Sequence, residues 1–331
     1  MSADRKKLEA ELRRAGLSDQ AIKAAWPSWW SDDVEGSPSG RTELRFALAR
    51  RLGLAPKALL GERVDFVWKN KARFKYLSTE DQAQQDAITS FGASIGRLLI
   101  RATPQEAKIG EVPALELRDA ILGGNDLVRL ESLLGTCWSI GIPVIHLRVF
   151  PLRAKSMHAM VIEDHGRYAV LLGKDASYPA PVAFTLAHEL GHIGLGHLDG
   201  TAAVVDLDDP AMSKDKDAQE VEADEYALTL LTGSPRPDIQ TDTDQFDAPT
   251  LAGAAIRASS EYGIEAGTMA LCLGYQRRIW PIAMSALKFI YHRPQPIWQF
   301  VNGIADTYLS WDDLSEDSAD YLRNIMFGTD A

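Results

Sequence analysis

Two histidines and a glutamate stand close together in the stretch TLAHELGHI, where His188, Glu189 and His192 form the pattern H-E-x-x-H. In a helix, a spacing of four residues places both imidazoles on one face, one turn apart, where they can share a metal ion. Glu189 lies between them and can accept a proton from a water molecule at the metal. Because zinc lowers the pKa of such a water to about 7, the motif predicts a hydrolytic zinc site with Glu189 as the general base.

The residues around the motif favour a buried helix. Short motifs of this kind also arise by chance, so two surface histidines on an ordinary helix are the alternative. Leu186, Ala187, Leu190 and Ile193 are all uncharged, as a buried active-site helix requires. Gly191 costs the helix roughly 1 kcal/mol against alanine. Its presence predicts close packing beneath the site.

A third metal ligand is expected from an acidic residue on the next predicted helix, Gln219–Leu231. Glu220 shares a face with small and apolar residues, and that face can press against the motif helix. Asp224, one turn on, could accept the free ring N–H of a ligating histidine and fix its orientation. Glu222 points elsewhere and is the less favoured ligand, and a solvated helix face is the alternative for all three acids. His197 falls one residue short of the third metzincin histidine, so it is expected in a loop or beside a ligand.

The elements before and after the motif are expected to form a small sheet and a second helix. Two apolar runs, 159–163 and 168–172, flank an Asp-His-Gly turn and predict a β-hairpin, and the run 142–150 predicts a further strand. The second hairpin strand could offer its edge to an extended peptide substrate. The motif helix is expected to begin near Pro181. A long acidic loop, residues 199–217, should separate it from the next helix.

Helical patterns dominate the rest of the chain, and the predicted class is α+β, mainly helical. A minimal zincin-like domain with a small sheet, residues 77–235, is expected between a helical N-terminal domain, 1–76, and a helical C-terminal domain, 236–331. Further helices are expected at residues 41–53, 79–100, 126–135, 251–259, 266–274 and 280–292.

Composition and charge exclude some classes of protein. No signal peptide is visible, and no apolar run reaches the ~20 residues that a bilayer-spanning helix needs. Cys137 and Cys272 are the only cysteines, so a reducing cytoplasm without a disulfide framework is expected. The net charge of −11 is uneven, because residues 1–75 carry 16 Lys and Arg against 10 Asp and Glu. This basic part could bind DNA phosphates or dock an acidic protein, whereas the acidic remainder should repel nucleic acid.

The motif region resembles the ImmA/IrrE family of metallopeptidases. Thr185–His192 matches the family's threonine-leucine-alanine lead into H-E-x-G-H. Glu220–Ala227 is similar to the family's E-x-x-A-N-x-F-A, with Asp in place of Asn and Tyr in place of Phe. The resemblance covers roughly residues 125–235. Residues 43–60 also resemble the second half of the family's XRE-type helix-turn-helix domain, which implies a degenerate version of that domain at the N-terminus.

By this resemblance, His188, His192 and Glu220 would bind zinc and Glu189 would act as the base. Members of the family that are active cleave phage-type or stress-response transcriptional repressors. The resemblance therefore implies a helix-turn-helix repressor as the protein substrate.

The sequence thus favours a zinc-dependent endopeptidase over a non-catalytic regulator that binds DNA or a repressor and keeps a structural zinc. Glu189 favours the enzyme, because a purely structural site needs no base. Four protein ligands would favour the regulator, and an open fourth position would favour the enzyme. A donor that stabilises the oxyanion could be Tyr178, His158, His165 or Tyr226, among which spacing does not choose.

Overall fold

The structure, a computed structural model, describes residues 3–61, 63–69, 72–75, 82–104, 112–152, 157–207, 216–243 and 245–329. The predicted class, α+β and mainly helical, is confirmed. The described helices are α1 (Ala3–Arg14), α2 (Asp19–Ala25), α3 (Asp32–Gly36), α4 (Pro38–Leu52), α5 (Pro56–Leu60), α6 (Gln82–Arg101), α7 (Ala114–Leu122), α8 (Leu130–Ser139), α9 (Pro179–Gly194), α10 (Ala218–Thr232), α11 (Ala248–Tyr262), α12 (Ala266–Arg277), α13 (Trp280–Tyr291), α14 (Ile297–Tyr308), the 3-10 helix η1 (Trp311–Asp313) and α15 (Glu316–Phe327). The described strands are β1 (Ala72–Lys75), β2 (Val144–His146), β3 (Ala159–Asp164), β4 (Arg167–Leu172) and β5 (Ala203–Asp206).

The strands form one mixed sheet in the order β1-β5-β3-β4-β2. Strands β3 and β4 are the predicted hairpin, and the turn between them places His165 and Gly166 at positive φ. Strand β5 runs antiparallel to β3. Strand β1 runs parallel to β5, and strand β2 runs parallel to β4. Strand β4 therefore lies between β3 and β2. The prediction that its edge is open to a peptide was wrong.

The sheet separates two hydrophobic layers. Successive residues of β3 point to opposite faces, so Met160 and Ile162 pack with α6, while Ala159 and Val161 pack with α9. Helix α6 approaches the sheet closely at Gly96, where a Cβ atom would lie 2.7 Å from the Ile162 side chain. The motif helix α9 is thus held against one face of a buried sheet.

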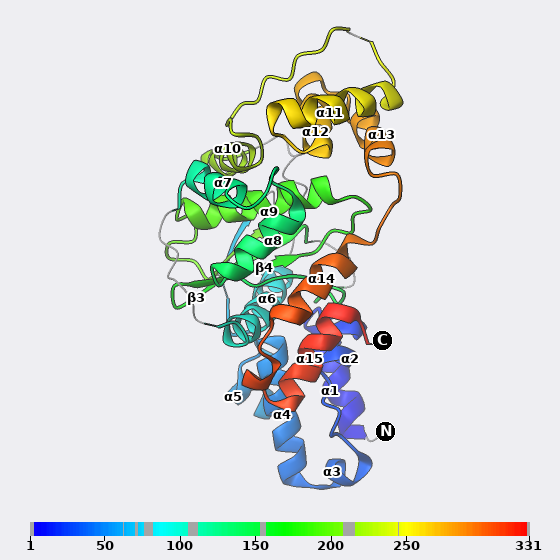
Figure 1. Ribbon diagram of the computed structural model, residues 1–331. Helices are drawn as coiled ribbons and strands as arrows, with labels where there is room; N and C mark the ends of the chain where they lie inside the picture. Colours follow the sequence, from blue (N-terminus) through cyan, green and yellow to red (C-terminus); the bar gives the residue numbers. More distant parts are fainter. Residues whose placement is uncertain are drawn as a thin grey trace.

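Helices from both ends of the sequence share the core on the α6 side. Helices α1, α2, α4 and α5 pack there together with α15, which lies beside α1 and α2 in Figure 1. The buried Arg51 side chain of α4 donates a hydrogen bond to the carbonyl of Ala25 (3.0 Å) and forms an ion pair with Asp317 (2.5 Å). Tyr321 of α15 donates to the carbonyl of Arg51 at 2.6 Å. These contacts tie the N-terminal helices to the C-terminal helix.

Helices α11, α12 and α13 form a small unit with a core of its own, next to α9 and α10 (Figure 1). Helices α12 and α13 pack so closely that a Cβ atom at Gly274 would lie 2.5 Å from the Cβ of Ala283. From this unit the chain returns through α14 to the sheet and to α15. The domain boundaries at residues 76 and 235 stay predictions. None of the described helices has the length and apolar character needed to cross a membrane.

Several elements differ from the predictions. Helix α7, strand β1 and strand β5 were not predicted, and the helix expected at 126–135 begins at Leu130 and extends to Ser139. The strand expected at 142–150 is confined to Val144–His146. Helix α6 is described from Gln82, and the start predicted at residue 79 lies outside the described residues.

Gly53 is a position where the close packing of α4 and α6 can be tested. It follows α4 with a φ of 66°, and a Cβ atom there would lie 2.3 Å from the carbonyl oxygen of Ser90. Left-handed strain costs roughly 1–2 kcal/mol and the backbone clash roughly 1–3 kcal/mol more. We therefore expect Gly53→Ala to lower the free energy of unfolding in urea by about 3 kcal/mol. Gly16 is the control, because it has a φ of 94° and open space where a Cβ atom would lie. If Gly16→Ala lowers the free energy of unfolding by the same amount, the clash at Gly53 is contradicted.

Candidate metal centre

Helix α9 carries the H-E-x-x-H motif on a buried surface. It begins at Pro179, two residues before the predicted start, and ends at Gly194. The side chains of His188, Glu189 and His192 are completely buried. The Nε2 atoms of the two histidines face each other 3.1 Å apart. The helix thus brings both imidazoles to one point, as the spacing predicted.

Helix α10 brings Glu220 to the same point. Asp217 caps the start of this helix by accepting a hydrogen bond from the backbone N–H of Glu220 at 3.0 Å. The predicted close packing at Gly191 is confirmed, since a Cβ atom there would lie 3.0 Å from the backbone of Ala223. Glu220 is 1% exposed, whereas the side chain of Glu222 is 57% exposed and lies beside His197.

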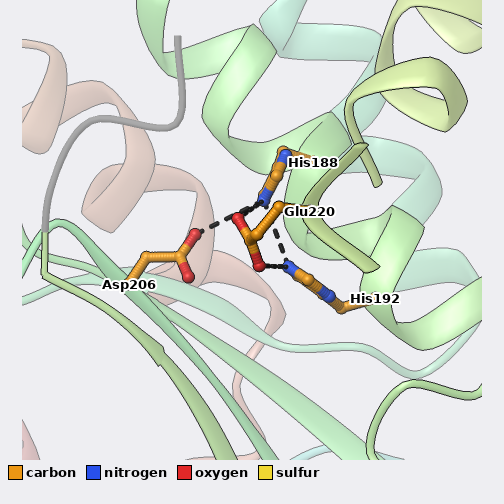
Figure 2. A group of neighbouring side chains, drawn as sticks. All are labelled: His188, His192, Asp206 and Glu220. Atoms are coloured by element: carbon orange, nitrogen blue, oxygen red, sulfur yellow. Dashed lines mark hydrogen bonds and ion pairs between the residues drawn. The ribbon is translucent and has the colours of Figure 1, made fainter. Parts of the chain in front are cut away.

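A fourth residue, Asp206, completes the cluster (Figure 2). It stands at the end of β5, is fully buried, and places Oδ2 3.4 Å from Nε2 of His188. The prediction of an acidic loop over residues 199–217 was therefore wrong in part, because 203–206 are a strand. The apolar run Ala203-Val204-Val205 before an aspartate was the available signal, but it is shorter than the runs of about four to eight residues that indicate a strand.

The four residues of this cluster lie close enough together to share one metal ion. Ligand atoms about 2.05 Å from a tetrahedral zinc lie about 3.3 Å from one another. Glu220 Oε2 lies 3.3 Å from His188 Nε2, and Glu220 Oε1 lies 3.3 Å from His192 Nε2. The contact of Asp206 with His188, at 3.4 Å, has nearly the same length. Candidate ligand atoms of all four residues lie within 4.8 Å of one another.

The buried carboxyl groups of the cluster would be stabilised by a cation. Burial, and then the nearby charge of Asp206, raises the pKa of Glu189 well above its ordinary value. Burial alone would lower the pKa of His188, but its contacts with Asp206, Asp224 and Glu220 outweigh it and raise that pKa. Both carboxylate oxygens of Glu189 and of Asp206 lack a hydrogen bond among the described residues. Buried carboxylates without such partners are costly unless a cation is present, so this donor set fits a metal ion.

Each motif histidine has a partner on its other ring nitrogen. Asp224 Oδ1 lies 2.9 Å from His188 Nδ1, as predicted, and Asp224 also pairs with Lys216. His192 Nδ1 lies 2.9 Å from His197 Nδ1. If Nε2 of each motif histidine is the ligand atom, its Nδ1–H donates to these partners, which fixes the tautomer and the orientation of the ring.

His197 and Glu222 have a place in the site beside the ligands. His197 Nε2 lies 3.1 Å from Glu222 Oε2, so His197 can accept from His192 and donate to Glu222. The expectation that His197 lies in a loop or beside a ligand is met, because it follows α9 and contacts His192. Arg73 of β1 donates to the carbonyl of His197 at 3.4 Å and contacts Gln219, which links the edge of the sheet to both helices.

The candidate oxyanion donors are distributed differently. His165 lies in the β3–β4 turn, and the hydroxyl of Tyr226 donates to the carbonyl of Val112 at 2.8 Å. Tyr178 and His158 instead line a cavity beside the start of α9. His158 Nε2 lies 2.9 Å from Thr185 Oγ1. Of the four candidates, Tyr178 and His158 are therefore the ones that border open space next to the motif helix.

Comparison with known proteins supports a peptidase. Residues 165–280 match the family Peptidase U49. This span begins in the hairpin turn and includes α9, β5 and α10, so the four clustered residues all lie within it. No curated protein matches the chain.

Proposed function

We propose that the protein is a zinc-dependent endopeptidase in which His188, His192 and Glu220 hold the metal. The observation that carries this proposal is the set of contacts among these three side chains, 3.1 to 3.3 Å long, next to the buried Glu189. Two histidines and one glutamate are a donor set typical of catalytic zinc in peptidases. The match to a peptidase family over residues 165–280 supports the same reaction class.

Glu189 would act as the general base and then as the acid. A zinc ion at this site would supply a Lewis acid that polarises the scissile carbonyl and makes the attacking water more acidic. Glu189 would take a proton from that water and later give it to the leaving amine. Burial raises the pKa of Glu189, and a raised pKa suits a carboxylate that must hold a proton between the two steps.

The proposed substrate is a transcriptional repressor with a helix-turn-helix domain. This choice rests on the resemblance of Thr185–His192 and Glu220–Ala227 to the ImmA/IrrE motifs. The basic residues within 1–75 offer a surface that could dock an acidic protein or DNA. Retardation of duplex DNA by the full chain, weakening as salt is raised, would be the sign of a DNA contact.

A second candidate function is favoured by Asp206. With this carboxylate beside His188, four protein side chains surround the position that a metal would take. Structural zinc sites use four protein ligands, whereas catalytic sites keep one position for water. A non-catalytic regulator with a structural zinc would therefore use Asp206 as its fourth ligand.

Comparison of protein N-termini in host cells tests the proposed function. One culture expresses the native chain and the other expresses Glu189→Gln, which keeps the shape of the side chain but removes the base. We expect a small set of new N-termini only with the native chain, because loss of a general base slows a reaction by about 100-fold to 10,000-fold. These termini would name the substrate and the scissile bond. Identical termini in both cultures, under unstressed and stressed growth, would instead favour the regulator.

A further inference from the structure

A cavity of about 970 Å³ lies where the first half of α9 and helix α10 meet helices α12 and α13. Ligand pockets in proteins have volumes of roughly 300–1,000 Å³, so this cavity is at the upper end of that range. It lies between the helices of the metal centre and the small unit α11–α13, which Figure 1 shows next to them. Its size suits a short stretch of chain or a molecule of similar volume.

Most of the cavity wall is apolar. Helix α10 contributes Val221 and Leu228, helix α12 contributes Tyr275, and helix α13 contributes Trp280 and Met284. Three of these large apolar side chains are exposed, by 42% at Val221, 57% at Tyr275 and 45% at Met284. Exposed apolar side chains that gather around a hollow mark a binding site more often than chance exposure.

The wall of this cavity includes residues that neighbour the metal centre. Thr185, one turn before His188 on α9, lines the cavity, as does Asp224 of α10. Asp224 Oδ1 lies 2.9 Å from His188 Nδ1. A bound segment that fills the cavity would therefore contact the motif helix at Thr185.

The charges of the wall favour a peptide over an anionic lipid. Three basic and four acidic residues line the cavity, so it has no excess of positive charge. Lys216 pairs with Asp224, and Arg236 pairs with Glu225 at 2.7 Å. A lipid headgroup would need surplus cations, whereas a peptide presents donors and acceptors in equal number along its backbone.

We propose that this cavity binds an apolar segment of the protein substrate, with large aliphatic or aromatic side chains, next to the bond to be cleaved. The inference rests on the proposed peptidase function, and it adds the chemical class that the substrate must present. It also assigns a role to the unit α11–α13, because helices α12 and α13 would supply part of the substrate-binding wall.

Peptide binding to the inactive Glu189→Gln chain tests this inference without any cleavage. The probe is a fluorescein-labelled twelve-residue peptide with Leu-Phe-Trp-Leu at its centre, and the reference peptide has four serines there. Fluorescence anisotropy should show that the apolar peptide binds at least about tenfold tighter, since burial of one large apolar side chain suffices for that factor. Adding Met284→Arg should remove this preference, because it places a charge in the apolar wall.

Ile256→Arg is the matched control, because Ile256 is 46% exposed, nearly as much as Met284, and lies on α11 outside the cavity wall. It should change the affinity by less than about twofold, as a surface substitution usually does. Tyr275→Arg on α12 repeats the test if Met284→Arg fails to fold. Equal binding of both peptides, or equal effects of the Met284 and Ile256 variants, would overturn the inference. If a fatty acid-like anion displaces the labelled peptide and no unlabelled peptide does, the cavity is a site for such an anion and the inference is wrong. Tight peptide binding without any cleavage by the native chain would reject the proposed function alone.

Discussion

Glu220→Ala is expected to remove zinc from the chain, whereas Glu222→Ala should leave one zinc per chain. Glu220 lies 3.3 Å from Nε2 of both His188 and His192 through its two carboxylate oxygens. It is only 1% exposed, and alanine would remove both of these contacts with the histidines. Loss of a partner outside the ligand shell already lowers metal affinity by about 10- to 100-fold. Loss of a ligand should lower it by at least about 100-fold and abolish cleavage.

Glu222 is a close control for this experiment. It lies two residues away on α10 and carries the same charge, but its side chain is 57% exposed and contacts His197. Native mass spectrometry of the purified variants gives the zinc stoichiometry, and circular dichroism shows whether each chain is folded. If Glu220→Ala retains zinc and Glu222→Ala loses it, Glu222 is the metal ligand and the proposed ligand set is wrong.

The parts of the site that lie on single helices could be predicted from the sequence. The spacing of His188 and His192 fixes their common face once α9 is a helix. The face shared by Glu220 and Asp224 follows from the same rule on α10. Both helices were predicted to within two residues at their starts, because apolar periodicity and turn residues mark long helices clearly.

Asp206 could not be predicted in the same way, because its position depends on the sheet. Strand β5 has four residues, and its neighbours are β1, far back in the sequence, and β3. A run of three apolar residues inside an acidic segment carries little periodicity. The pairing of Ala159 with Asp206 brings this aspartate to the start of β3, and Asp206 contacts His188 of α9 from there. Such a contact is set by strand register, which local sequence specifies only weakly.

The edge of the sheet shows the same limit. The sequence identified β4 as a strand but not its neighbours, and the short parallel strand β2 covers the side that was expected to be free. The cavity beside α9 was missed for a related reason. Its wall combines residues from α9, α10, α12 and α13, and no single stretch of sequence carries that combination.

Asp206→Asn should retain zinc and raise the rate of cleavage. In a peptidase, water must occupy the metal position that Asp206 would otherwise fill. The amide keeps the shape of the side chain but loses its charge, so it competes less well for that position. The closed arrangement is the one in which the Asp206 carboxylate, and not water, occupies the fourth metal position. The rate of cleavage should rise about tenfold for each 1.4 kcal/mol by which the native carboxylate favours this arrangement. Titration with acetohydroxamate, a small anion that binds zinc at an open position, should show tighter binding to the variant.

The two candidate functions give opposite results for this variant. If zinc is structural, removal of the charge on the fourth ligand, Asp206, should lower the zinc affinity and the stability of the chain. No cleavage should then appear with the native chain or with the variant. Asp199→Asn is the control, because Asp199 is exposed and the charge change is the same. It should alter neither zinc content nor cleavage. Because His188, His192 and Glu220 remain in the Asp206 variant, a gain of cleavage with one bound zinc would mean that three ligands suffice and that Asp206 restrains the enzyme. Loss of zinc from this variant would instead make Asp206 an essential ligand, and the closed site would then belong to the regulator.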